Sequence, residues 1–154
     1  MRPEIPPNSY HFEVSFTDKR FAKDRGFQSV AGLQAQLVFP NEHSRRPTDH
    51  QFGDLTLSRA LDTDSKLASW FLEVIHAKKL ATVDLSIALL NSEHEAVVRW
   101  YICGALPIRW EMDEFDALRS GIAMERFSFR CESISLNPPK KPRPKPTKGL
   151  RQKK

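Results

Sequence analysis

Apolar and polar residues alternate with a period of two along much of the first 136 residues, and this pattern constrains the fold more than any other feature. Alternation of this kind is typical of β-strands with one face buried and one face exposed. It occupies residues 10–16, 82–90, 96–106 and 122–134. Polar residues 91–95 join the middle two segments, which predicts a β-hairpin. Pro107 is expected to end the strand that precedes it or to lie at a sheet edge, because a proline has no N–H to donate to a neighbouring strand.

Two further segments are expected to be extended. Residues 27–39 alternate in their second half, and Gly32 marks a bend or bulge within this long element. A shorter strand is predicted over residues 54–58. Residues 41–51 between them are polar and charged and contain Pro47, which predicts an exposed loop.

One segment has the period of a helix instead. Its apolar residues recur at three- and four-residue intervals and form a single stripe: Leu67, Trp70, Phe71, Val74 and Ile75. Residues 62–65 offer an N-cap and negative charge at its start, and Lys78 and Lys79 lie near its end, as the helix dipole favours. We expect the stripe to cover the chain's own sheet. The predicted fold is therefore mainly β (α+β), an antiparallel β-sandwich or barrel with one packed helix.

Several classes of protein are excluded by composition. No apolar stretch approaches the ~20 residues of a membrane-spanning helix, and the first residues lack the apolar run of a secretory signal. The six glycines form no phosphate-binding loop and the five histidines show no zinc-ligand spacing. Cys103 and Cys131 are expected to be buried free thiols; a disulfide between them is the alternative. We predict no catalytic, cofactor or metal site; the acidic residues Glu111, Asp113 and Glu114 are expected in a solvated, irregular segment.

Positive charge is concentrated at the carboxyl end. The chain has 24 basic and 19 acidic residues, but residues 137–154 hold eight of the basic ones and no acidic one. The remaining 16 basic and 19 acidic residues leave residues 1–136 with a net charge of −3. We therefore divide the chain into a body, residues 1–136, and a basic tail, residues 137–154. Five prolines interleaved with lysine and arginine predict an extended or disordered tail.

Short motifs along the body point to a family. Residues 26–33, GFQSVAGL, resemble the "gF-x-x-V-x-G-L" signature of tail tube proteins from contractile phage tails and phage-tail-like contractile injection systems. The strongest match is residues 100–110, WYICGALPIRW, which is similar to the family's "W-x-l-x-n-A-x-P-x-k-W". The order of the family's other motifs is also present: residues 55–59 and the helix with Trp70 precede this match, and residues 115–117 and 122–125 come after it. Ala60 departs from the pattern, because the family usually has glycine there.

The resemblance implies a structural role rather than an enzymatic one. Family members form hexameric rings that stack into a hollow tube inside a contractile sheath. The implied partners are further copies of the chain, the sheath, another tube paralogue, and spike and baseplate proteins, with DNA or effector proteins as cargo in the lumen. The implied location is the bacterial cytoplasm during assembly, then the virion tail or the injection particle.

In related tubes the long loop after the second strand reaches the adjacent ring. Here that position corresponds to residues 41–52, and the candidate ring-stacking residues are Arg45, Arg46, His50 and Phe52. The alternative is an ordinary solvated loop.

The basic tail lies outside the resemblance. Its basic residues are Lys140, Lys141, Arg143, Lys145, Lys148, Arg151, Lys153 and Lys154. A hexameric ring would gather 48 such charges, which repel within a few Debye lengths of ~8 Å. The tails therefore point outward, pair with acidic partners, or belong to a specialised ring that joins tube to spike and baseplate, the hypothesis we favour. The alternative function is non-specific nucleic-acid binding through the tail.

Overall fold

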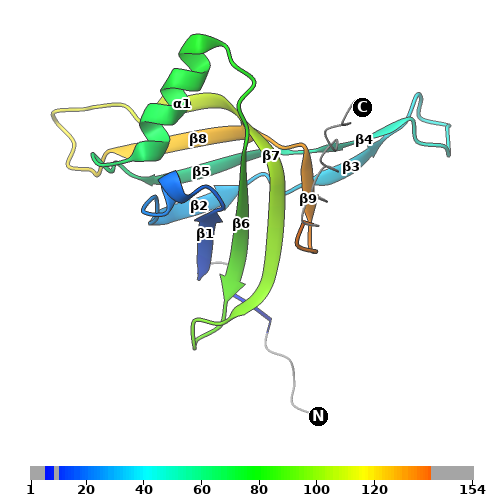
Figure 1. Ribbon diagram of the computed structural model, residues 1–154, viewed down its shortest axis with the longest axis horizontal. Coiled ribbons are helices and arrows are strands. Elements are labelled where there is room, and N and C mark those ends of the chain that lie inside the picture. Colours follow the sequence, from blue (N-terminus) through cyan, green and yellow to red (C-terminus); the bar gives the residue numbers. More distant parts are fainter. Residues whose placement is uncertain (1–5, 9–10, 140–154) are drawn as a thin grey trace, which may run out of the picture.

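A strongly bent antiparallel sheet forms the body of the protein, with one helix laid against it and a two-stranded hairpin projecting from one end (Figure 1). The computed structural model describes residues 6–8 and 11–139. The described elements are β1 (Phe12–Phe16), the 3₁₀ turn η1 (Lys19–Phe21), β2 (Phe27–Ala31), β3 (Ala35–Val38), β4 (Asp49–Phe52), β5 (Asp54–Ala60), α1 (Lys66–Ala77), β6 (Val83–Leu90), β7 (Ala96–Met112), β8 (Met124–Arg130) and β9 (Ser133–Ser135).

The sheet has the strand order β1-β6-β7-β8-β5-β2, and β9 pairs with β7. Its two ends come together, because the ring of Phe16 at the end of β1 lies 6.2 Å from the ring of Phe27 at the start of β2. The sheet thus curls into a barrel-like body. This architecture confirms the prediction of a mainly β, antiparallel fold with one packed helix.

Strand β7 is the element that bends the sheet. Its first part pairs with β6 and its second part with β8, so it belongs to both walls of the body. Pro107 does not end this strand, since β7 runs for 17 residues to Met112. It lies at a sheet edge, as the alternative predicted, because among the described strands only β8 pairs with β7 at this residue. Pro107 lies at a register shift against β8, where a proline without an N–H is tolerated. Gly104 has a φ of 64° just before this point.

The core lies between α1 and the sheet. The rings of Phe127 and Phe129, both fully buried on β8, lie 5.3 and 5.1 Å from the ring of Phe71 on the helix. Leu67 and Val74 are buried beside them, which confirms that the apolar stripe covers the chain's own sheet. Ile75, at the end of the stripe, is 41% exposed.

Other strand predictions need correction. Residues 27–39 are two strands in different sheets, because Gly32 turns the chain out of the body with a φ of 94°. Residues 49–51 are not loop but part of β4, which pairs with β3. The β4 sequence lacks apolar alternation because both faces of the hairpin are largely exposed, so nothing requires an apolar face. Residues 122–134 likewise divide into β8 and β9, and β5 continues to Ala60.

Only the first three residues of the basic tail, 137–139, are among the described residues. Its eight basic residues, from Lys140 onward, lie outside the described residues, and the boundary at residue 136 stays a prediction. Among the helices of the described part, none is long and apolar enough to cross a membrane.

Candidate assembly interface

The β3–β4 hairpin, residues 35–52, is the most prominent projection from the body (Figure 1). Two glycines form its base. A Cβ atom on Gly32 would lie 1.8 Å from the carbonyl oxygen of Asp54, and one on Gly53 would lie 2.6 Å from the carbonyl oxygen of Gly32. The Gly53 N–H donates to the carbonyl oxygen of Gln34 at 2.8 Å. The two segments that enter and leave the hairpin therefore touch backbone to backbone, which sets its direction.

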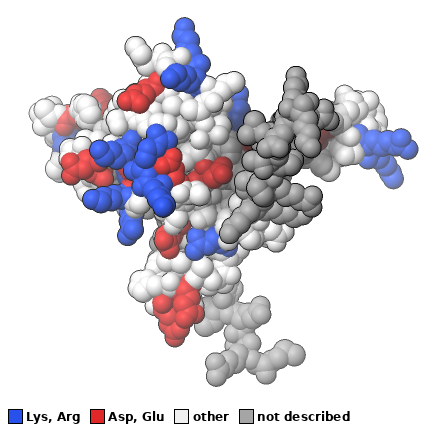
Figure 2. Space-filling model, viewed as in Figure 1, with Lys and Arg blue, Asp and Glu red and all other residues white. Residues whose placement is uncertain are grey.

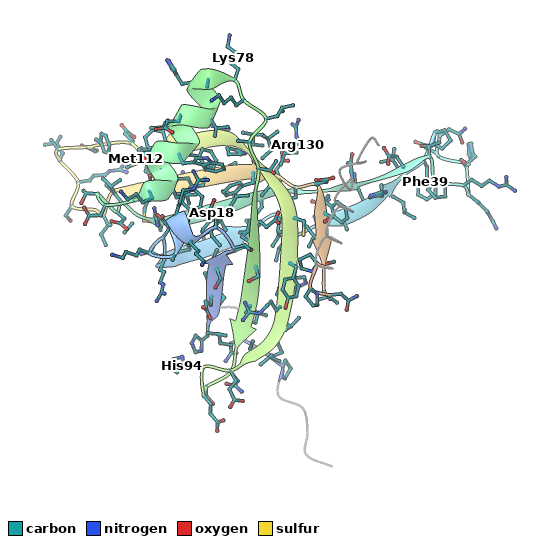
Figure 3. All side chains as sticks on the ribbon, viewed as in Figure 1. Asp18, Phe39, Lys78, His94, Met112 and Arg130 are labelled. Carbon is teal, nitrogen blue, oxygen red and sulfur yellow. The ribbon has the colours of Figure 1, made fainter. Side chains whose placement is uncertain are left out.

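The predicted ring-stacking residues are on the hairpin but do not form one cluster. Arg45 and Arg46 are exposed in the connection at its tip, where Figure 2 shows the positive charge. His50 and Phe52 lie on β4 nearer the base, with their ring centroids 5.6 Å apart. Two apolar residues of the hairpin that were not among the predicted contacts, Leu37 and Phe39, are 57% and 43% exposed; Phe39 is labelled in Figure 3.

A cavity of about 530 Å³ opens beside the base of the hairpin. Its lining is mainly polar and includes Gln34, Gln36, Asp54, Arg130 and Glu132. Cys131 also lines it; burial raises the pKa of this thiol, so it is protonated at neutral pH and a poor nucleophile.

A buried cluster of charges holds the body together, and sequence reasoning missed it. Asp24, Arg59 and Glu125 are 3%, 1% and 0% exposed. The Arg59 guanidinium lies 2.9 Å from an Asp24 oxygen and 3.6 Å from a Glu125 oxygen. It is held between the rings of Phe27 and Phe127, with centroids at 5.0 and 5.3 Å. Arg59 and Glu125 lie in two of the segments that resemble the family, residues 55–59 and 122–125, but these motifs do not indicate that the two residues are in contact.

The same carboxylates bind neighbouring elements. Asp24 accepts hydrogen bonds from the Ser65 hydroxyl at 2.7 Å and from the Leu67 N–H at 3.2 Å, so it supports the start of α1. Ser65 itself is the N-cap, as predicted for residues 62–65. Glu125 accepts from the indole N–H of Trp110 at 2.9 Å, which links β8 to β7. The cluster therefore connects β5, β8 and the second part of β7 with the start of the helix.

The acidic residues near the end of β7 are mostly paired. Glu111 is not in an irregular segment but in β7, and it contacts Arg109 at 2.6 Å and Arg126 at 3.3 Å. Asp113 also pairs with Arg126. Over residues 6–8 and 11–139, no group of three or more His, Cys, Asp or Glu side chains is arranged to hold a metal ion.

Comparison with known proteins identifies the family of this chain. The family model described as T4-like virus tail tube protein gp19 matches residues 8–135. The chain belongs to this tail tube family. No individual curated sequence matches it at a significant level.

The fold of this tail tube family member is similar to that of chains in solved contractile injection systems. A chain of the extended sheath–tube complex of the PVC extracellular contractile injection system superposes with a TM-score of 0.70 at 21% identity, covering 86% of this chain and 91% of that one. A chain of the anti-feeding prophage tube-terminating cap gives 0.69 at 22% identity, with 88% and 93% covered. A chain of the anti-feeding prophage baseplate gives 0.66 at 21%, with 86% and 96% covered.

Proposed function

We propose that this chain is a structural subunit of the inner tube of a contractile tail or contractile injection system, forming stacked hexameric rings. The observation that carries this is the family match over residues 8–135, on a body whose fold resembles that of chains in sheath–tube, cap and baseplate assemblies. Strand β2 ends the sheet of the described body, and ring formation would cover such an edge against unwanted pairing. The rings would assemble in the bacterial cytoplasm, and the lumen would pass DNA or effector proteins.

The hairpin supplies the stacking contact in this proposal. Its backbone-tight glycine base and its exposed side chains support a rigid arm that reaches beyond its own subunit. Deleting residues 42–50 would remove the tip with Arg45 and Arg46 and shorten β4, while leaving every strand pair of the main sheet intact. We expect the purified variant to keep its circular dichroism spectrum but to form no tubes by negative-stain electron microscopy.

A variant in which Gly and Ser replace residues 42–48 at unchanged length is the control for this deletion. It separates the length of the arm from its side chains: we expect it to keep the hairpin and still to fail to stack. Tubes of normal length from the deletion variant would refute a stacking role for the hairpin.

We further propose that this chain forms the specialised ring that joins the tube to the spike and baseplate. The basic tail supports this, because 48 tail charges per hexameric ring would repel strongly if repeated in every ring of a long tube. Immunogold labelling of whole particles tests it. Label confined to one end is expected, and uniform label from end to end would identify the bulk tube subunit instead.

Non-specific nucleic-acid binding is the second candidate function, favoured by one observation: the tail has eight basic residues and no acidic one. The tail has no aromatic residue for base stacking, so such binding would be electrostatic. Its logarithmic affinity for duplex DNA would fall with the logarithm of salt concentration with a slope of up to about −7. A monomer whose DNA affinity falls with salt in this way would favour nucleic-acid binding as the function. Rings or tubes that do not bind DNA at physiological salt would exclude it.

A further inference from the structure

Large apolar side chains are exposed at two opposite ends of the molecule. At one end is the hairpin, with Leu37 and Phe39. At the other is the 113–123 loop, which joins β7 to β8 and exposes Phe115 by 76%, Leu118 by 96% and Ile122 by 72%. Figure 1 shows the hairpin and this loop at the two ends of the long axis. Clustered exposed apolar residues of this size mark interaction surfaces.

The charges of the hairpin tip and of the 113–123 loop are opposite in sign. The hairpin tip, residues 41–48, has Arg45 and Arg46 against one acidic residue, Glu42, and a second acidic residue, the exposed Asp49, begins β4 beside it. Neither guanidinium has a hydrogen-bond or ion-pair partner among the described residues. The 113–123 loop has three acidic residues and one arginine. Within it, Asp113 pairs with Arg126. Asp116 lies 3.6 Å from the exposed Arg119 and accepts a hydrogen bond from the Leu118 N–H. Glu114 has no partner in the described part of the chain.

One copy cannot bring these ends together, because the whole barrel-like body lies between them (Figure 1). Two copies can, in a head-to-tail contact that uses two different surfaces. Such a contact leaves a free hairpin on one copy and a free loop on the other, so further copies can add in the same way. It repeats along an axis when the rotation between copies does not close it into a ring. This is the geometry that stacking of rings requires.

We propose that the hairpin tip of one copy docks on the 113–123 loop of a copy in the adjacent ring. Leu37 and Phe39 would pack against Phe115 and Leu118, and Arg45 and Arg46 would face Glu114 and Asp116. The inference rests on the proposed function and names the partner surface of the stacking contact.

A second acidic surface is the natural rival. The turn between β6 and β7 has Glu93 and Glu95, and Figure 2 shows acidic residues at the lower end of the body. Its nearest large exposed apolar residue is Val97, at 53%. A hairpin docked there would place Phe39 opposite a mainly polar surface and leave the three apolar residues of the 113–123 loop in water. The loop therefore complements the hairpin in both charge and apolar surface.

Charge reversal tests the pairing in the full-length chain. Sedimentation and electron microscopy would measure the fraction of protein in tubes, with circular dichroism to verify folding. We expect R45E/R46E and, separately, E114K/D116K to lower the tube fraction at least tenfold while single rings persist. The variant with all four changes should recover a tube fraction within twofold of the unmodified chain, since the charges are then exchanged. E93K/E95K is the matched control and should form tubes normally.

The outcomes separate this inference from the proposed function. Normal tubes from both charge-reversal pairs would overturn the docking while leaving the tube function intact. Loss of tubes with E93K/E95K, rescued by adding R45E/R46E, would overturn it by assigning the contact to the β6–β7 turn. An unmodified chain that forms neither rings nor tubes would refute the proposed function itself. If a reversed variant misfolds, R45Q/R46Q and E114Q/D116Q replace it, with the same loss of stacking expected.

Discussion

Removing Arg59 should destabilise the fold more than removing any exposed arginine. In Arg59→Met, two carboxylates that are almost completely buried, Asp24 and Glu125, lose their cation. Breaking a buried ion pair on one side costs about 3–5 kcal/mol, because an uncompensated charge stays in the interior. Whole domains are stable by only about 5–15 kcal/mol. At about 2–4 °C per kcal/mol for a chain of this size, the melting temperature should fall by about 6–20 °C.

Arg126→Met is the matched control. Arg126 also bridges two acidic residues, Glu111 and Asp113, but its side chain is 39% exposed. Partly exposed pairs contribute about 0–1 kcal/mol. Urea unfolding followed by tryptophan fluorescence would give the free energy of unfolding of both variants. If the two differ by less than 1 kcal/mol from each other, the buried cluster does not stabilise the body as argued.

A charge-free variant sharpens this test. Adding Asp24→Asn and Glu125→Gln to Arg59→Met removes the stranded charges, and buried ion pairs replaced by neutral groups are often close to neutral in stability. We expect this triple variant to recover part of the lost free energy. A triple variant as unstable as the sum of its separate changes would show that the residues act independently.

Two further predictions concern backbone and thiol. Gly32→Ala should lower the free energy of unfolding by at least about 1–3 kcal/mol and disturb the hairpin, because the added Cβ would meet the Asp54 carbonyl oxygen at a positive φ. Gly26→Ala is the control. Its φ is 77° and no atom lies within 4 Å of the added Cβ, so it should cost only the strain of that φ. Equal unfolding free energies for the two would refute the contact argument. Burial raises the pKa of the Cys131 thiol, so alkylation followed by mass spectrometry should be much slower in the folded chain at pH 7 than in urea. Equal rates would show that the thiol is not buried.

Local pattern was enough to predict most of the secondary structure. The period of two located β1, β6 and the start of β7, and the stripe from Leu67 located α1, whose cap at Ser65 was also expected. Each of these elements buries one face, so its apolar residues recur with the period of a strand or a helix. The motifs of residues 26–33 and 100–110 pointed to the tail tube family, which the family match confirmed.

The candidate site was predicted only in part, for a physical reason. Residues 41–52 were selected through the resemblance, but their pairing as β3 and β4 was not, since a hairpin exposed on both faces needs no apolar period. Nothing in the sequence indicated that the 113–123 loop lies at the opposite end of the molecule. That relation depends on the path of β7 between two walls of the sheet.

By itself, then, the sequence determined most strands of the main sheet, the helix, the family and the difference in charge between residues 1–136 and residues 137–154. Only the tertiary structure decided which distant residues meet. It brought Asp24, Arg59 and Glu125 together from three separate segments, carried β7 through Pro107, and pressed Gly32 against Asp54 at the base of the hairpin. Periodicity reports how each residue faces the core, whereas pairing between remote segments is set by the packing of the whole sheet, which no local pattern encodes.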